Sequence, residues 1–186
     1  MAKHRVQSEE LVFNGQHIQV RVDRLLHPDG RVWSKELVIH PGAVCVVALL
    51  DNGDVVLVRQ YRHAAGQELL EICAGGLNAG EDPTEAAIRE LEEETGYRAA
   101  KMVERARFWT TPGFTTEFMY LYEATGLVKT QINPDEDESI EVEIVTPEEA
   151  LLMIDDGRIQ DAKSILGLQR VLLQPLLARS GTSPGC

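Results

Sequence analysis

The 186-residue sequence has few cysteines, few aromatic residues and no long apolar run. Its three cysteines, Cys45, Cys73 and Cys186, match neither the spacing of a zinc site nor the even number of a disulfide framework. This scarcity fits a reducing compartment, so we expect a cytoplasmic protein. No stretch approaches the roughly 18 apolar residues of a membrane span, and the N-terminus lacks the apolar core of a signal peptide.

Basic residues are also fewer than acidic ones. The chain has 18 lysines and arginines against 30 aspartates and glutamates, for a formal net charge of −12. Such a surface repels phosphate backbones and anionic lipids, so neither nucleic acid nor a membrane is an expected partner. A phosphorylated small molecule remains compatible with this charge, because bound divalent cations would reverse the local field.

The patterning predicts one main domain with a small N-terminal addition. Within residues 1–40, alternating apolar positions and turn signals predict an antiparallel three-stranded β-meander between Glu10 and Ile39, after a loose start. Such a meander is too small to stand alone, so we expect it to pack on the main domain or on another subunit, and a homodimer is the expected assembly. Residues 41–178 form the expected main domain, and the polar residues 179–186 form an expected disordered tail.

The main domain mixes strand and helix signals, which predicts an α/β fold with a mixed sheet. The apolar run of residues 43–50 is typical of a strand covered on both faces. Further strands are expected at residues 55–61, 69–73, 101–109, 118–124 and 140–145. A helix should run from Thr146 to about Gly157. A second should begin near Asp161, with one apolar face made of Ile165, Leu168, Leu172 and Leu176.

The most informative stretch is residues 75–97, GGLNAGEDPTEAAIRELEEETGY. Asp82 can cap a helix whose first position is Pro83, and Gly96 stands where a left-handed cap would end it. On that helix, Glu90, Glu93 and Glu94 lie at spacings that place three carboxylates on one face. A divalent cation such as Mg²⁺ would turn their mutual repulsion into attraction.

A plain solvated helix is the alternative interpretation of these carboxylates, and Arg89, four residues from both Glu85 and Glu93, can brace it by pairing with them. The complete string, however, resembles the Nudix box of hydrolases that cleave nucleoside diphosphates linked to another moiety. Only Tyr97 departs, being aromatic where an aliphatic residue is usual. The positions that carry the resemblance are Gly75, Glu81, Arg89, Glu90, Leu91, Glu93, Glu94 and Gly96.

The resemblance implies a Nudix α/β/α sandwich over residues 41–178. It also implies that Glu90, Glu93 and Glu94 hold Mg²⁺, with Mn²⁺ as the alternative ion, and that Glu81 lies near them. Glu93 and Glu94 would take part in catalysis through that metal.

Two further segments are similar to one subfamily, the ADP-ribose pyrophosphatases. The run from Glu71 to Gly75, Glu-Ile-Cys-Ala-Gly, resembles the subfamily's Glu-Leu-Pro-Ala-Gly, which implies that the Ala74 carbonyl helps to hold a metal ion. Pro112 follows Gly96 by 16 residues, a distance that marks the same subfamily. An ordinary Pro-Gly turn is the alternative interpretation of Pro112.

Other residues are candidates for substrate binding and for water activation. Arg62, at a strand end, could clamp a phosphate in a bidentate manner. Related enzymes carry a glutamate that activates water on the loop around residues 133–139, and spacing does not choose between Glu136 and Glu138. Trp33 resembles a tryptophan that stacks on adenine across a homodimer, with Glu36 accepting from the adenine amino group; core packing is the alternative for Trp33.

The sequence therefore predicts a Mg²⁺-dependent, homodimeric hydrolase of a nucleoside diphosphate sugar. ADP-ribose is the expected substrate, cleaved to AMP and ribose 5-phosphate. Two alternatives stay open, namely hydrolysis of another sugar nucleotide such as GDP-mannose, and a catalytically silent module that binds a nucleotide as a sensor.

Overall fold

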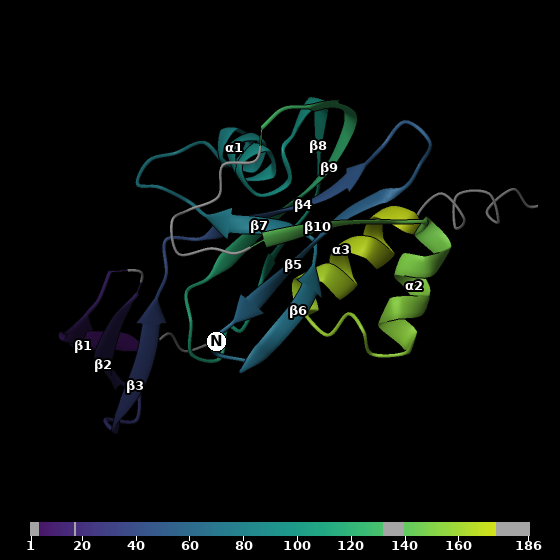
Figure 1. Ribbon diagram of the computed structural model, residues 1–186. Helices are drawn as coiled ribbons and strands as arrows, with labels where there is room; N and C mark the ends of the chain where they lie inside the picture. Colours follow the sequence, from purple (N-terminus) through teal and green to yellow (C-terminus); the bar gives the residue numbers. More distant parts are fainter. Residues whose placement is uncertain (1–3, 17, 132–139, 174–186) are drawn as a thin grey trace, which may run out of the picture. The chain divides into compact units, whose positions relative to one another are not determined.

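The computed structural model describes residues 4–16, 18–131 and 140–173 (Figure 1). The chain divides into two compact units. The first extends to Gly42 and includes Phe108–Met119, and the second contains Ala43–Arg107 and the chain from Tyr120 onward. None of the helices in the described ranges is both long and apolar enough to cross a membrane.

The first unit contains a three-stranded antiparallel sheet in the order β1-β2-β3. Its strands are β1 (Arg5–Asn14), β2 (Gln19–Leu26) and β3 (Val32–Ile39). The meander thus begins five residues before Glu10, and the expected loose start is wrong for residues 5–7, because Arg5 and Val6 pair with the far end of β2. The segment 110–117 joins this unit through the amide of Val38, which donates to the Phe114 carbonyl at 2.8 Å.

A mixed seven-stranded sheet forms the centre of the second unit. Five strands follow the order β10-β5-β4-β9-β8, while β6 pairs with β5 and β7 with β4. Their bounds are β4 (Ala43–Leu49), β5 (Val55–Arg62), β6 (Gln67–Glu71), β7 (Cys73–Gly76), β8 (Tyr97–Trp109), β9 (Phe118–Lys129) and β10 (Ile140–Val145). The expected strand at residues 69–73 is divided between β6 and β7, which lie on different partners.

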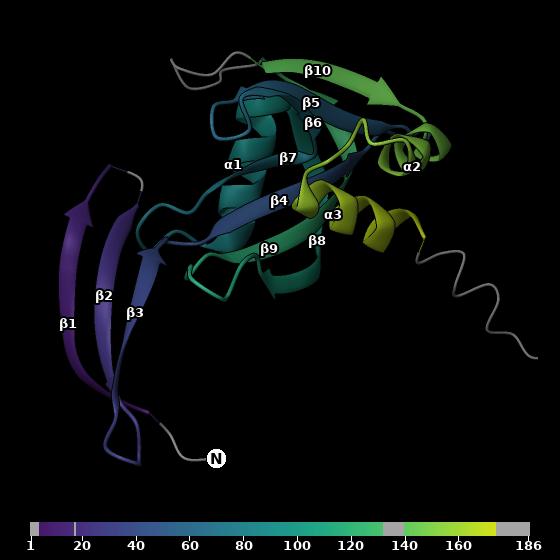
Figure 2. The ribbon, with the colours of Figure 1, turned by 90° about the horizontal axis from the view of Figure 1, so that it is seen from below.

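Helices cover both faces of this sheet, which confirms the α/β/α sandwich (Figure 2). The helices are α1 (Pro83–Thr95), α2 (Pro147–Asp155) and α3 (Ala162–Leu172). Successive residues of β4 serve opposite layers: Val46 lies in the cluster with Leu91 of α1, and Val47 lies against Gly167 of α3. The run of residues 43–50 is apolar because its strand is covered on both sides.

The buried face of α3 matches the expected one at Leu168 and differs elsewhere. Ser164, Gly167, Leu168 and Val171 are buried, whereas Ile165 and Leu172 are only partly so, and Leu176 lies outside the described residues. Ser164 turns inward because its hydroxyl accepts the amide of Ile72 at 2.9 Å. A Cβ at position 167 would lie 2.8 Å from the Cδ1 of Ile72, so α3 approaches the sheet closely there.

Candidate active site

The acidic helix α1 begins and ends where its sequence predicts. The Asp82 carboxylate accepts the amide of Thr84 at 2.8 Å and that of Glu85 at 3.3 Å, and Pro83 is the first helical residue. At the other end, Gly96 has φ of 68°, a conformation that strongly favours glycine. The two caps fix which turn of α1 faces strand β7.

Arg89 gathers the carboxylates on one side of α1. Its Nε donates to Glu81 at 2.9 Å, and its Nη1 donates to Glu90 at 2.7 Å and to Glu93 at 2.9 Å. Its Nη2 reaches the Gly76 carbonyl at 3.3 Å, which closes the loop before α1 onto the helix. The guanidinium, together with the Asn78 amide, lowers the pKa of Glu81 from 4.5 to about 2. Arg89 therefore offsets only part of the negative charge of this face, from within the same motif.

Glu90 lies against the backbone of β7. A Cβ atom on Gly75 would overlap the Glu90 carboxylate, so only glycine at position 75 lets the strand and this side chain approach so closely. Gly75, which begins the motif, and Glu90, the first of the three glutamates predicted to bind metal, therefore contact each other.

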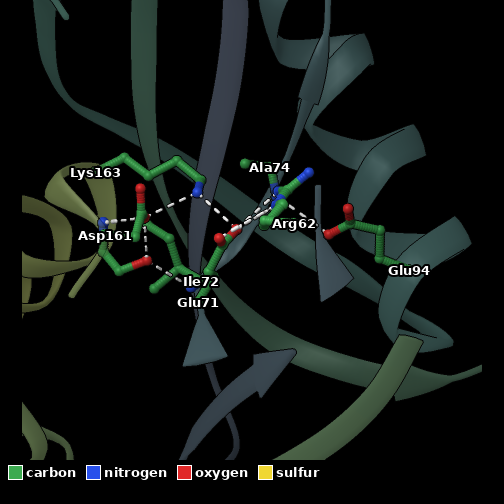
Figure 3. Close-up of polar contacts among 8 residues, drawn as sticks. Arg62, Glu71, Ile72, Ala74, Glu94, Asp161 and Lys163 are labelled. Carbon is green, nitrogen blue, oxygen red and sulfur yellow. Dashed lines mark hydrogen bonds and ion pairs between the residues drawn. The ribbon is translucent and has the colours of Figure 1, made fainter. Parts of the chain in front are cut away.

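Glu94 is almost fully buried, with 2% of its surface exposed. Its Oε2 accepts the amide of Ala74 at 3.1 Å, as Figure 3 shows. Burial and the adjacent Glu94 carboxylate raise the pKa of the Cys73 thiol well above its usual value. Glu94, one of the three glutamates predicted to bind metal, thus lies beside Ala74, whose carbonyl is predicted to help.

The donor chemistry here fits a hard divalent cation. Glu90 contacts Gly75 and Glu94 contacts Ala74, which brings two carboxylates and a peptide backbone together. Mg²⁺ and Mn²⁺ prefer such oxygen ligands. Glu93 is turned toward Arg89, and no three acidic, histidine or cysteine side chains converge as a ready-made cage anywhere in residues 4–16, 18–131 and 140–173.

Arg62 lies close to this site but is engaged by another carboxylate. Its Nε donates to Glu71 at 3.2 Å and its Nη2 donates to Glu71 at 2.7 Å. Glu71 also accepts from Lys163 of α3 at 2.8 Å. Neither Glu71 nor Lys163 was predicted to have a functional role. An acidic residue inside the apolar run LLEIC is nevertheless a signal that Glu71 is buried and paired.

The other predicted substrate contacts are dispersed. The Trp33 ring packs against the His27 ring in a tilted orientation, at 4.9 Å between ring centroids, while Glu36 is exposed on β3. Because Trp33 pairs with Leu25 and Glu36 with Val22, the two side chains alternate to opposite faces, and the structure does not bring them together. Pro112 is exposed in a turn where the Phe114 amide donates to the Thr111 carbonyl. Glu136 and Glu138 lie outside the described residues.

The family profile described as NUDIX domain matches residues 39–167. The chain belongs to the Nudix family. This Nudix chain is 41% identical over 170 residues to the "Methanol dehydrogenase activator" of Bacillus methanolicus, covering 90% of this chain and 92% of the relative. It is 38% identical over 172 residues to the "ADP-ribose pyrophosphatase" of Bacillus subtilis (strain 168), covering 91% and 93%.

A solved structure, "Crystal structure of ADP compounds hydrolase", has the same fold as this Nudix chain, with a TM-score of 0.82 and 97% of both chains covered. At 23% sequence identity this likeness concerns the fold alone. Together with the family match, it confirms the fold and the family predicted from residues 75–97.

Proposed function

We propose that this Nudix pyrophosphohydrolase cleaves the diphosphate bond of a nucleoside diphosphate sugar, with ADP-ribose as the preferred substrate and AMP and ribose 5-phosphate as products. The observation that carries the proposal is the contact of Glu90 and Glu94 with the backbone of residues 74 and 75. The 38% identity to an ADP-ribose pyrophosphatase over nearly the whole of both chains supports the substrate.

Glu90, Glu93, Glu94 and the Ala74 carbonyl would hold the metal ion, which we propose to be Mg²⁺, with Mn²⁺ as a substitute. A bound divalent ion would polarise the phosphoryl oxygens and lower the pKa of a bound water. Arg89 and Glu81 keep the face ordered, since Arg89 holds Glu90 and Glu93 from the side.

Substrate contacts are assigned to other parts of the chain. Arg62 binds a phosphate oxygen, and Trp33 and Glu36 are the proposed contacts of the base. Pro112 shapes the loop that follows β8. Glu136 or Glu138 accepts the proton of the attacking water. One of the two variants Glu136→Gln and Glu138→Gln should therefore lower kcat with little change in KM.

We further propose a cytoplasmic homodimer that assembles through the sheet of the first unit. Every residue of β1 is exposed, and a three-stranded sheet has little capacity to bury its own apolar side chains. Exposed large apolar residues on this sheet are Val6, Leu11, Val12, Phe13, Val32 and Trp33. A reducing compartment suits the buried, unpaired thiols of Cys45 and Cys73.

A substrate panel tests the function directly. Purified protein with Mg²⁺ is incubated with ADP-ribose, GDP-mannose, other sugar nucleotides and deoxynucleoside triphosphates, and the products are separated by chromatography. We expect AMP and ribose 5-phosphate from ADP-ribose at the highest kcat/KM. Preferred cleavage of GDP-mannose would change the substrate, and tight binding without cleavage of any compound would indicate a silent sensor.

The 41% identity to the "Methanol dehydrogenase activator" favours a second candidate function, namely that this protein increases the rate of a dehydrogenase. Adding the protein to a methanol dehydrogenase assay tests it. A rise in dehydrogenase rate that Glu94→Gln abolishes would support this role, and an unchanged rate would exclude it for that dehydrogenase.

A further inference from the structure

Four charged side chains form a connected network beside the candidate active site (Figure 3). Arg62 and Lys163 both donate to Glu71, and Lys163 also donates to Asp161 at 2.8 Å. The network has two cations and two carboxylates, so its formal charges balance. It links the end of β5, the end of β6 and the start of α3.

The inner members of this network are buried. Glu71 is 1% exposed, and the side chain of Lys163 is 11% exposed. A buried carboxylate that loses a partner suffers a large desolvation penalty, so both donors to Glu71 are strongly held. Arg62 is the outermost member, with 36% of its side chain exposed.

The first turn of α3 anchors the network. Asp161 caps this helix by accepting the amide of Ser164 at 3.0 Å and its hydroxyl at 2.6 Å. The Ser164 hydroxyl accepts the amide of Ile72, the residue next to Glu71. Helix α3 therefore holds both the side chain of Glu71, through Lys163, and the amide of the next residue, Ile72, through Ser164. Ile72 lies two residues before Ala74, whose amide donates to Glu94.

The geometry defines which edge of Arg62 is available. Glu71 occupies the edge formed by Nε and Nη2, and this leaves Nη1 on the opposite side of the planar guanidinium. In Figure 3 the Arg62 side chain is drawn between the carboxylates of Glu71 and Glu94. An arginine held by a carboxylate on one edge is preorganised to donate to an anion from the other.

We propose that Lys163 is a positioning residue for the reaction: by fixing Glu71, it sets the orientation in which Arg62 presents Nη1 to a phosphate of the substrate. The inference rests on the proposed function, because it assigns the phosphate to Arg62. It also gives α3 a role in substrate binding through residues that do not touch the substrate.

A double-mutant cycle tests the proposal. We expect Lys163→Met to raise KM for ADP-ribose about ten-fold with kcat within about two-fold of wild type, because binding rather than chemistry is disturbed. In an Arg62→Ala background the same substitution should change KM by less than about two-fold, because the lysine acts through Arg62. Lys163→Arg should restore most of the affinity, and Lys101→Met, which removes an exposed lysine of β8, should have no effect.

Two outcomes would overturn the proposal. One is an unchanged KM in a folded Lys163→Met protein, and the other is a full effect of Lys163→Met in the Arg62→Ala background. If Lys163→Met does not fold, Asp161→Asn takes its place, since asparagine retains the helix cap and removes only the charge that holds Lys163. KM should then rise about two- to three-fold, and no rise would count against the proposal.

Calorimetry with inorganic pyrophosphate separates this inference from the proposed function, because it requires no turnover. Wild-type protein should bind pyrophosphate about ten-fold more tightly than Lys163→Met, while Lys101→Met matches wild type. This result in a protein that hydrolyses nothing in the substrate panel would leave the positioning role standing and the proposed function wrong. Equal affinities would overturn the positioning role, whatever the panel shows.

Discussion

Arg89 is the residue on which the order of the acidic helix face depends. It contacts Glu81, Glu90 and Glu93 at once, so like charges that would repel one another share a single cation. The sequence indicated pairings with Glu85 and Glu93, each four positions away, and of these two Arg89 contacts Glu93. It did not indicate the pairing with Glu81, which precedes the helix and reaches Arg89 only because the loop folds back.

The contribution of Arg89 to stability should depend on pH. The pKa of Glu81 is lowered to about 2, so this pairing stabilises the fold above the ordinary pKa of 4.5 and is lost as pH falls toward 2. We expect Arg89→Met to reduce the free energy of unfolding by about 1–3 kcal/mol at neutral pH. The loss should shrink between pH 4.5 and pH 2 in urea titrations.

Arg98→Met provides the control. Arg98 of β8 pairs with Glu92 of α1, and 61% of the Arg98 side chain is exposed. Its effect should stay within about 0.5 kcal/mol at every pH. A penalty for Arg89→Met that is constant from neutral pH to pH 2 would contradict the assignment of the Glu81 pKa shift to Arg89.

Neutralising a glutamate that is proposed to bind metal should strongly reduce turnover and spare the fold. We expect Glu94→Gln and Glu93→Gln to lower kcat by roughly two orders of magnitude or more at saturating Mg²⁺. The glutamine oxygen at position 94 can still accept the Ala74 amide, so the melting temperature should change little. Glu92→Gln is the matched control, and near-wild-type kcat in both test variants would refute the metal assignment.

At the scale of elements, strand β7 and helix α1 function as one unit. Their contact depends on the absence of a side chain at Gly75, whereas the neighbouring Gly76 has open space where a Cβ would lie. The two glycines therefore differ in what they contribute, although they are adjacent in sequence.

Alanine substitutions separate the two glycines. Gly75→Ala should displace the Glu90 carboxylate, reduce the free energy of unfolding by about 1–3 kcal/mol and lower turnover. Gly76→Ala should stay within about 0.5 kcal/mol of wild type, because nothing lies within 4 Å of the added atom. Chemical denaturation and steady-state kinetics measure both effects, and equal effects of the two substitutions would show that the Glu90 contact is not the cause.

Elements whose signals are local were predictable, and those that depend on distant partners were not. Asp82 and Gly96 mark the ends of α1 through their own backbone preferences. Ser164, in contrast, is buried because of a hydrogen bond to Ile72, 92 positions away in sequence. The pairing of Glu71 with Lys163 spans the same distance, so periodicity could reveal neither the inward face of α3 nor the charge network.

At the scale of the whole molecule, the two units differ in how well they bury their apolar residues. The second has a core cluster that includes Val44, Val46, Cys73 and Leu91 at 0% exposure. In the first unit, Leu11 and Phe13 of β1 are more than half exposed. A surface of this kind is typical of an interaction site, and the homodimer proposed above would cover it.

Light scattering should therefore find about twice the chain mass of 20.7 kDa at micromolar concentration. Leu11→Glu should convert the protein to a monomer, because it places a charge in the proposed interface. Val128→Glu is the control, since Val128 is 63% exposed on β9 in the second unit. A wild-type protein of single-chain mass would rule out the homodimer.

The two buried cysteines, Cys45 and Cys73, can report when the central sheet opens. Cys45 is opposite Ala74 and Cys73 is opposite Val46, so the two thiols lie on different faces and cannot be oxidised to a shared disulfide. Burial raises the pKa of Cys45 to about 12 and that of Cys73 well above its usual value, which keeps both thiols protonated. In a Cys186→Ser protein, an alkylating reagent should label them only as fast as the β4–β7 ladder opens, so labelling kinetics would measure the free energy of that opening without any added probe.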